Sequence, residues 1–305
     1  MDLLSEILTH AGWQNDLLWS AALAGSWGYR FPCEKSGGLH IVTRGRCYVR
    51  FGGQDRPLPL EKGDVVFILR GVHHDLVSTP RGAALDISRL GEAGVRAGNQ
   101  KREKQNGTTT DLISIRYEIP DRPRHPFFQE LPDSIVLRSS DVPIADPIHT
   151  TIALIAREIE GGNPADLVVQ RLTDVLLYYV LRRWVDSNPD AKSGWVAVFR
   201  DEVVLRVLDQ IHRDPLREWT INCLAGSVGL SRASVAARFK KALGLTVMDY
   251  ILRVRLEKGR ALLAGTNYAL EEIAGLVGYS SAFAFSKAYK RVYGESPRST
   301  RQKSA

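Results

Sequence analysis

Histidine and cysteine side chains are the first candidates for chemistry in this chain, because they bind metals and act as bases or nucleophiles. His40 stands alone, His74 has only His73 beside it, and the cysteines are far apart without a C-x-x-C pair. A catalytic metal needs about three protein ligands, and one or two histidines do not complete that set. No Gly-rich phosphate loop and no nucleophile paired with a base is recognisable. The sequence therefore predicts no metal, no cofactor and no enzymatic activity.

The last third of the chain suggests a different chemistry, because it repeats itself. Ala225 and Gly229 in INCLAGSVGLS recur as Ala274 and Gly278 in LEEIAGLVGYS, 49 positions later. FKKALG at 239–244 recurs as YKRVYG 50 positions later, so the second copy has gained one residue after the turn. A small residue where two helices cross, followed by a glycine that can adopt positive φ, is typical of a helix-turn-helix.

Each copy continues with the signals of a second helix that has one buried face. A serine is the expected N-cap: Ser231 in the first copy and Ser280 or Ser281 in the second. Two residues spaced i to i+4 then anchor this helix to the core. The pairs are Val235 with Phe239 and Phe285 with Tyr289.

Between the copies, an apolar stripe indicates one long helix that would hold the two units rigidly. Its members are Leu252, Leu256, Gly259 and Leu263. Two second helices held roughly 34 Å apart could enter successive major-groove turns on one face of a DNA duplex. We therefore expect sequence-specific binding to double-stranded DNA.

The free faces of the two second helices carry the candidate DNA contacts. In the first unit these are Arg232, Ala233, Ser234, Ala236, Ala237, Arg238, Lys240 and Lys241. In the second unit they are Ser281, Ala282, Phe283, Ser286, Lys287 and Lys290. The basic residues of the first unit are expected to contact phosphates, which fix position without reading sequence. Ala236 and Ala237 either meet a thymine methyl group or read nothing. Phe283 either contacts bases or packs against the preceding helix. Of these two interpretations, we favour packing.

Charge supports this division of the chain. Residues 196–305 contain 18 Lys and Arg against 10 Asp and Glu, whereas residues 1–195 contain 23 against 24. A basic region beside a near-neutral one suggests that only the former contacts a polyanion. No stretch approaches the roughly 20 apolar residues of a membrane span, and Asp2 and Glu6 stand where a secretory signal is positive. We expect a cytoplasmic protein with no membrane partner.

The first half of the chain is predicted to be β-rich. LHIV at 39–42, CYVRF at 47–51 and DVVFIL at 64–69 are short strand patterns, and Cys47 and Val49 fall on an apolar face. The polar run Asn99–Thr110 is expected to be a surface loop before the strand DLISIRYEI.

After Pro147 the apolar period becomes helical. Ile148, Ile152, Ile155 and Ile159 recur at spacings of 4, 3 and 4. A second stretch, Leu167–Trp184, has a stripe of Val168, Leu172, Val175, Tyr179 and Arg183. Two helices therefore follow the β region, and NPDAKSG at 188–194 is the best linker in the chain.

Residues 196–301 resemble the DNA-binding domain of the AraC/XylS family of bacterial regulators. IAGLVGYSSAFAFSKAYKRVYGESPRSTR follows the family pattern I-A-x-x-V-G-Y, F-S-[RK]-x-[FY]-[KR] and G-x-[ST]-P. The first unit, SRASVAARFKKALG, fits less tightly, and Ala236 and Ala237 depart from the larger residues usual there. The resemblance implies that Lys287, at the position of the family's usual Arg, reads or clamps DNA.

The β region resembles the cupin barrel that often precedes such domains. GDVVFILRGVHHDL at 63–76 carries this resemblance, and HPFFQELPDSIVL at 125–137 resembles its end. The family's metal site needs an H-x-H pair, which is missing here, so we expect a metal-free barrel. A closed barrel can enclose one small ligand, which predicts an unknown effector bound by His40, Val42, Phe67 and His74. Thiol-based sensing through Cys33 or Cys47 is an open alternative.

These observations predict an α+β multidomain protein. A cupin-like antiparallel β-barrel at 1–140 would sense, helices at 141–187 would pair two subunits, and 188–195 would link them to an all-α double helix-turn-helix domain at 196–305. The expected function is that of a ligand-responsive transcription regulator acting as a homodimer on promoter DNA, with RNA polymerase as a further partner if it activates. Two alternatives remain open: a metal-dependent cupin enzyme with a helical accessory domain, and a helical protein-interaction module.

Overall fold

The computed structural model describes residues 3–52, 56–90, 109–119, 125–161, 166–188 and 194–304. The chain divides into two compact units, Asp2–Ser187 and Asn188–Ala305. In the described residues, no helix has the length and apolar character that spanning a membrane requires. The predicted surface loop lies outside the described residues except for Thr109 and Thr110, and so do residues 189–193 of the linker.

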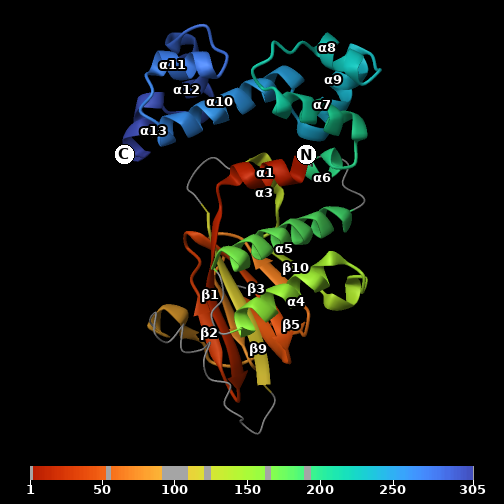
Figure 1. The fold of residues 1–305 in the computed structure, drawn as a ribbon, viewed down its shortest axis with the longest axis vertical. Coiled ribbons are helices and arrows are strands. Elements are labelled where there is room, and N and C mark those ends of the chain that lie inside the picture. The colour runs from red at the N-terminus through yellow and green to blue at the C-terminus, as the bar shows by residue number, and fades with distance from the viewer. Residues whose placement is uncertain are drawn as a thin grey trace. The chain divides into compact units, whose positions relative to one another are not determined.

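Two β-sheets form the body of the N-terminal unit (Figure 1). The first has the order β1 (Gln14–Ala24), β9 (Thr109–Glu118), β3 (Ser36–Arg44), β6 (Val65–Ile68) and β10 (Ser134–Leu137). The second has the order β5 (Leu58–Glu61), β4 (Arg46–Phe51), β7 (His74–Val77), β2 (Gly28–Phe31) and β8 (Leu85–Asp86). β2 and β8 pair in parallel, and the other strand pairs in the described residues are antiparallel. The strands predicted at 39–42, 47–51 and 64–69 are all present.

Apolar side chains from both sheets fill the space between them. Cys47 and Val49 of β4 are fully buried, as their alternation with polar neighbours predicts. They belong to one cluster with Trp19 of β1, Val66 of β6 and Leu112 of β9. Because the strands contribute every second residue to this cluster, their intervening residues point to the opposite faces of the sheets.

The first sheet is buried on its outer face as well. There, Phe67 and Tyr117 contact the ring of Trp13, each at 6.1 Å between ring centroids. Helix α3 (Pro126–Glu130) adds Phe128, which lies 4.6 Å from Trp13. Helix α5 (Asp166–Asp186) crosses the same side (Figure 1). The Tyr117 hydroxyl donates to the carbonyl of Thr173 on this helix at 3.1 Å. Burial on both faces explains why residues 64–69 form an almost continuous apolar run.

Two helices follow the sheets, as predicted. Asp146 caps α4 (Pro147–Glu160) by accepting from the backbone N–H of Ile148 at 3.0 Å, and Pro147 occupies its first turn. Both helices belong to the same compact unit as the sheets. Short helices at Leu3–Ala11 (α1), Ile87–Leu90 and Ser139–Asp141 complete this unit.

The apolar stripe of α5 that the sequence suggested is not the one that packs on the sheet. The buried side chains are instead Val169, Thr173, Leu176, Leu177, Val180, Leu181 and Val185. Leu167, Val168 and Val175 remain 63%, 42% and 42% exposed. α5 is therefore apolar on two sides, and periodicity alone could not tell which side faces the sheet.

The C-terminal unit is all helical. Its elements are α6 (Gly194–Val198), α7 (Glu202–Arg213), α8 (Ile221–Ser227), α9 (Arg232–Leu243), α10 (Val247–Gly265), α11 (Leu270–Leu276), α12 (Ala282–Tyr293) and α13 (Pro297–Ser304). α10 is the long helix predicted between the repeats, with Leu256, Gly259 and Leu263 buried (Figure 1). Gly194 and Trp195, assigned to the linker from sequence, instead begin α6. Trp195 is 1% exposed and its ring lies 6.3 Å from that of Tyr250 on α10.

Two glycines of α10 make a matched test of this packing. A Cβ atom added at Gly259 would lie 2.7 Å from Cε2 of Phe285, whereas one added at Gly265 would meet no atom within 4 Å. We predict that Gly259→Ala lowers the free energy of unfolding by about 1–3 kcal/mol through overpacking. Gly265→Ala should raise it by up to about 1 kcal/mol because alanine loses less backbone entropy. Urea denaturation measures both, and equal stabilities would contradict the close contact of α10 with α12.

Candidate DNA-binding interface

The turns of the two helix-turn-helix units have the same geometry. Gly229 and Gly278 adopt φ values of +70° and +78°, as the repeat predicts. Ala225 and Ala274 are 3% and 0% exposed where the helices of each unit cross. The residue after each glycine donates its backbone N–H to the carbonyl of that alanine, at 3.0 Å in the first unit and 2.9 Å in the second. Both turns are therefore closed in the same way.

The second helix of each unit, α9 and α12, is capped at both ends. Ser231 accepts from the backbone N–H of Ser234, and Ser281 from that of Ala284, both at 3.2 Å. Of the two serines considered for α12, Ser281 is thus the cap. Gly244 and Gly294 end the helices with φ values of +69° and +73°. We call α9 and α12 the recognition helices.

One face of each recognition helix is buried. Val235 is 1% exposed, and Phe239, Phe285 and Tyr289 are completely buried, which confirms the predicted anchors. The Tyr289 hydroxyl also hydrogen-bonds to the Thr300 hydroxyl at 2.8 Å. Because these side chains are buried, the opposite face of each recognition helix is turned toward solvent.

Most predicted contact residues lie on these outward faces. The exposed ones are Arg232, Ala233, Ala237, Arg238, Lys240, Lys241, Phe283, Lys287 and Lys290. The partly buried ones are Ser234, Ala236, Ser281, Ala282 and Ser286. Arg291, the counterpart of Lys241 at the 50-residue repeat distance, is exposed as well and was missed. Aligning the two copies position by position could have found it.

Arg238 already has an acidic partner. Its guanidinium lies 3.1 Å from the carboxylate of Asp201, which caps α7. The arginine would have to share or leave this ion pair to reach a phosphate. No local pattern could predict this contact, because the two residues are 37 positions apart.

Phe283 does not pack against the preceding helix, the interpretation favoured from sequence. Its side chain is 79% exposed, whereas Phe285 two positions later is completely buried. Two helical positions differ by about 200° around the axis, so burial of Phe285 turns Phe283 outward. An apolar ring therefore stands in the first turn of α12, next to the basic side of the helix.

In the N-terminal unit, the structure brings together His40 and His74, two of the predicted effector contacts. Their Nε2 atoms lie 2.8 Å apart, and both side chains are buried. His40 Nδ1 hydrogen-bonds to the Ser114 hydroxyl at 2.8 Å, and His74 Nδ1 to the carbonyl of Val72 at 3.1 Å. The ring of Phe31 stacks on His74 with 5.1 Å between centroids.

Hydrogen-bond chemistry assigns the protons in this chain. The Val72 carbonyl only accepts, so His74 Nδ1 must donate, and in the neutral ring that the lowered pKa of His74 favours, its Nε2 accepts. His40 Nε2 then donates to His74, and its Nδ1 accepts from the Ser114 hydroxyl. Both imidazoles are neutral in this arrangement. Burial lowers the pKa of His74 to about 4, and burial together with His74 lowers the pKa of His40 well below its ordinary value.

Val42 shares the inner face with His40, but Phe67 does not. Strand pairing places His40 opposite Val66 and Leu39 opposite Phe67, so Phe67 points to the outer face of the sheet. There it contacts Tyr117 and Trp13. The prediction that Phe67 lines an inner pocket with the histidines is corrected by this register.

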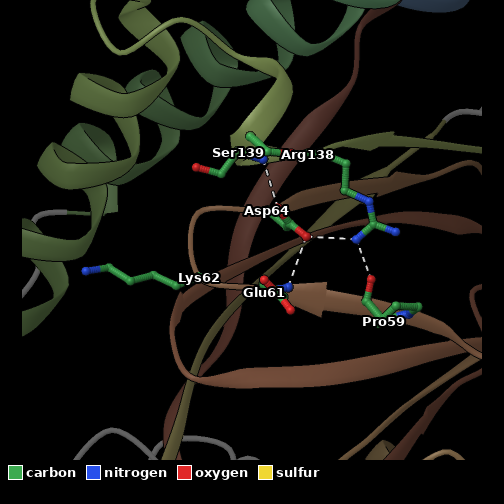
Figure 2. A pocket seen from close by; sticks show the side chains of 7 residues that line it. Pro59, Glu61, Lys62, Asp64, Arg138 and Ser139 are labelled. Atoms are coloured by element: carbon green, nitrogen blue, oxygen red, sulfur yellow. Dashed lines mark hydrogen bonds and ion pairs between the residues drawn. The ribbon is translucent and has the colours of Figure 1, made fainter.

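A hollow of about 400 Å³ lies elsewhere on the N-terminal unit, around Asp64. Figure 2 shows the Asp64 carboxylate accepting from Arg138 at 2.8 Å and from the backbone N–H groups of Ser139 and Glu61 at 2.8 and 2.9 Å. Arg138 also donates to the carbonyl of Pro59. These bonds tie the end of β10 to the turn before β6, so Asp64 has a structural role.

The buried cysteines are poorly suited to thiol chemistry. Burial raises the pKa of Cys33 to about 11 and that of Cys47 to about 12. Since the thiolate is the reactive form, burial and the raised pKa values disfavour the reaction of both thiols at neutral pH. In the described residues, no group of three or more His, Cys, Asp or Glu side chains could hold a metal ion.

Comparisons with known proteins agree with this two-part structure. Residues 2–186 match a cupin family model, and residues 224–303 match a helix-turn-helix domain model. The chain is 33% identical over 302 residues to a putative AraC-like transcription regulator of Streptomyces lividans, covering 97% of both chains. The chain belongs to the family of AraC-like transcription regulators. An HTH-type transcriptional regulator of Neisseria gonorrhoeae, MtrA, is 29% identical over 304 residues and again covers 97% of both chains.

Family membership confirms the predicted resemblance and fold. This AraC-family protein is a DNA-binding transcription regulator with a β-rich cupin domain followed by a helical domain. These two relatives are named as transcription regulators, and they match this chain over nearly their full length. This supports the regulator function against the cupin-enzyme and interaction-module alternatives.

The histidine pair predicts that this AraC-family regulator loses stability in acid. In the folded state His74 titrates at about 4, whereas an unfolded histidine titrates near 6.5. Between these values only the unfolded state takes up the proton. Stability is therefore fully present above about pH 6.5 and falls as the pH drops towards 4, by about 3 kcal/mol for His74.

Denaturation of the N-terminal unit at a series of pH values measures this loss. The double variant His40→Gln/His74→Gln should have a flatter dependence between pH 4 and 6.5. His73→Gln, which changes the exposed neighbour, should flatten it much less, because His73 makes only the smallest of the contributions that set the pKa of His74. An unchanged slope in the double variant would show that the pair is not responsible.

Proposed function

We propose that this regulator binds promoter DNA by placing α9 and α12 in successive major-groove turns. The observation that carries the proposal is the matched pair of capped recognition helices, each buried on one side by its anchors and exposed on the other. In this arrangement Arg232, Lys240 and Lys241 of α9 contact phosphates, as do Lys290 and Arg291 of α12. Lys287 contacts a phosphate or a guanine edge.

The exposed faces of α9 and α12 differ in the base contacts that they can make. Ala233 and Ala237 offer only methyl groups, so α9 contributes mainly position. Phe283 offers an exposed ring that would meet the methyl group of a thymine. We therefore propose that base discrimination is concentrated at α12.

Two neighbouring residues of α12 provide a matched test of this division of labour. In a salt series with a duplex selected from a random pool, Lys287→Ala should reduce the slope of log affinity against log salt by about 1. Phe283→Ala should leave the slope unchanged. It should instead remove most of the affinity difference between the selected duplex and the same duplex made with deoxyuridine in place of thymidine.

Arg81→Ala is the control for net charge, because Arg81 is an exposed residue of the N-terminal unit in the turn between β7 and β8. It should change neither the slope nor the affinity. Wild-type binding without a salt dependence would refute the DNA-binding arrangement itself. A slope unaffected by Lys287→Ala would remove only this residue from the interface.

We further propose that an effector binds between the sheets, at His40, Val42 and His74. The two histidines lie there beside the buried Ser114 hydroxyl, and their bond to each other could be exchanged for bonds to a ligand with donor and acceptor groups. Such a ligand should raise the melting temperature of the wild type and not that of His40→Gln/His74→Gln. A ligand that stabilises both equally would bind elsewhere.

We also propose that the regulator is a homodimer that pairs through the outer faces of α4 and α5. Leu154 of α4 and Leu167, Val168 and Val175 of α5 are each more than 40% exposed, an unusual set of apolar side chains for a solvated face. A second copy of the same helices would cover them. RNA polymerase would be a further partner at promoters where the regulator activates.

Sedimentation velocity over a range of concentrations tests this interface. The wild type should sediment as a dimer, and Val175→Asp should shift it towards the monomer by burying a charge. Ser187→Asp adds the same charge at an exposed position just after α5 and should remain dimeric. A Val175→Asp protein that dimerises like the wild type would place the interface elsewhere.

A further inference from the structure

Arg255, in the middle of α10, connects the long helix to the first helix-turn-helix unit. Its Nε donates to the carbonyl of Pro215 at 2.8 Å. Its Nη2 donates to the carbonyls of Leu216 at 3.2 Å and Arg217 at 2.9 Å. One guanidinium group therefore holds three successive carbonyls of the loop between α7 and α8.

This loop is held together by its own contacts and leads directly into α8, which Thr220 caps by accepting from the backbone N–H of Cys223 at 3.2 Å. The Trp219 indole donates to the carbonyl of Asp214 at 2.7 Å, and Trp219 is 6% exposed. Arg217 covers the same ring, with its Cζ 4.4 Å from the ring centroid. The Arg255 guanidinium is thus bound to an internally packed loop that continues into the first helix of the first unit.

The same guanidinium lies against the turn of the second unit. A Cβ atom added at Gly278 would be 3.3 Å from Cζ and 3.4 Å from Nη1 of Arg255. Gly278 closes the turn before α12 and has a φ of +78°. A side chain at this position would crowd the arginine. Glycine is therefore required both by the positive φ of the turn and by the close approach of Arg255.

The position of Arg255 along α10 explains why such a contact matters. Tyr250 on α10 packs against Phe239 of α9, with 5.6 Å between ring centroids, and Gly259 packs against Phe285 of α12. Nine residues of helix correspond to about 13 Å and about two and a half turns, so the recognition helices are anchored on opposite sides of α10. Bending or twisting of α10 between these anchors would change their relative orientation.

We propose that Arg255 is a positioning residue that fixes the orientation of α9 relative to α12, and thereby the spacing between the two DNA blocks that the regulator accepts. The part concerning DNA rests on the proposed arrangement of both recognition helices on one duplex. The part concerning orientation does not, because it follows from contacts within the C-terminal unit.

The first experiment measures orientation without DNA. In the full chain with Cys223→Ser, spin labels are attached through Lys241→Cys and Arg291→Cys, at equivalent exposed positions of α9 and α12. The remaining cysteines are buried. Pulsed electron resonance should give a narrow distance distribution in this background, and Arg255→Met should at least double its width. An unchanged width would overturn the proposal.

Two further variants make this result decisive. Arg255→Lys keeps the charge but loses the forked guanidinium that bonds to several carbonyls, so it should also broaden the distance distribution. It replaces Arg255→Met in this test if that variant does not fold. Lys258→Met changes an exposed residue of the same helix and should keep the narrow distribution. Broadening by Lys258→Met to the same extent would mean that any change in α10 loosens the unit, against a specific role for Arg255.

The second experiment measures spacing on DNA. With the duplex selected from a random pool, inserting one base pair between its two blocks should weaken wild-type binding by about ten-fold or more, because one block loses its base contacts. In Arg255→Met the same insertion should cost less than about three-fold, although overall affinity falls. A purely structural role would lower affinity for both duplexes equally, and that result would contradict the proposal. Failure of the wild type to bind any duplex would instead refute the proposed function and leave the label distances to decide the orientation.

Discussion

The DNA-binding unit depends on one constraint: both recognition helices are anchored by an aromatic side chain to the same long helix. Phe239 packs on Tyr250 and Phe285 packs on Gly259, nine residues apart on α10. Each anchor fixes which face of its helix points outward, and the rigidity of α10 fixes the distance between the two faces. Without this shared support, the exposed basic residues of the two units would have no defined separation and could not match a regular duplex.

Local patterns made much of this unit predictable from the sequence. The repeat identified both turns, because a glycine with positive φ and a small residue at the helix crossing are required wherever this motif forms. The capping serines and the aromatic anchors followed from helical spacing alone, since caps and i to i+4 pairs involve residues close in the chain. The β-strands around Cys47 and Val66 were predictable for the same reason, because alternation is a local signal.

The features that the sequence could not supply depend on partners far apart in the chain. The sequence pattern places Phe67 with His40, whereas the strand register puts Phe67 on the other face of the sheet. The pairing of Arg238 with Asp201 and the hydrogen bond between His40 and His74 join residues 37 and 34 positions apart. On α5, two apolar stripes compete, and only the position of the sheet decides which is buried. In each case the sequence shows which residue types are present, but the contacts between them depend on the three-dimensional fold.

The two copies of the motif have equivalent buried residues but different exposed residues, and this difference has a consequence for gene control. α9 presents methyl groups where α12 presents the ring of Phe283 and the ammonium group of Lys287. A molecule with two unlike ends has polarity, so a site that accommodates both helices is not a palindrome within one subunit. Inverting the part of a site that one subunit binds would reverse that subunit on the duplex, and a different side of it would then face the start of transcription.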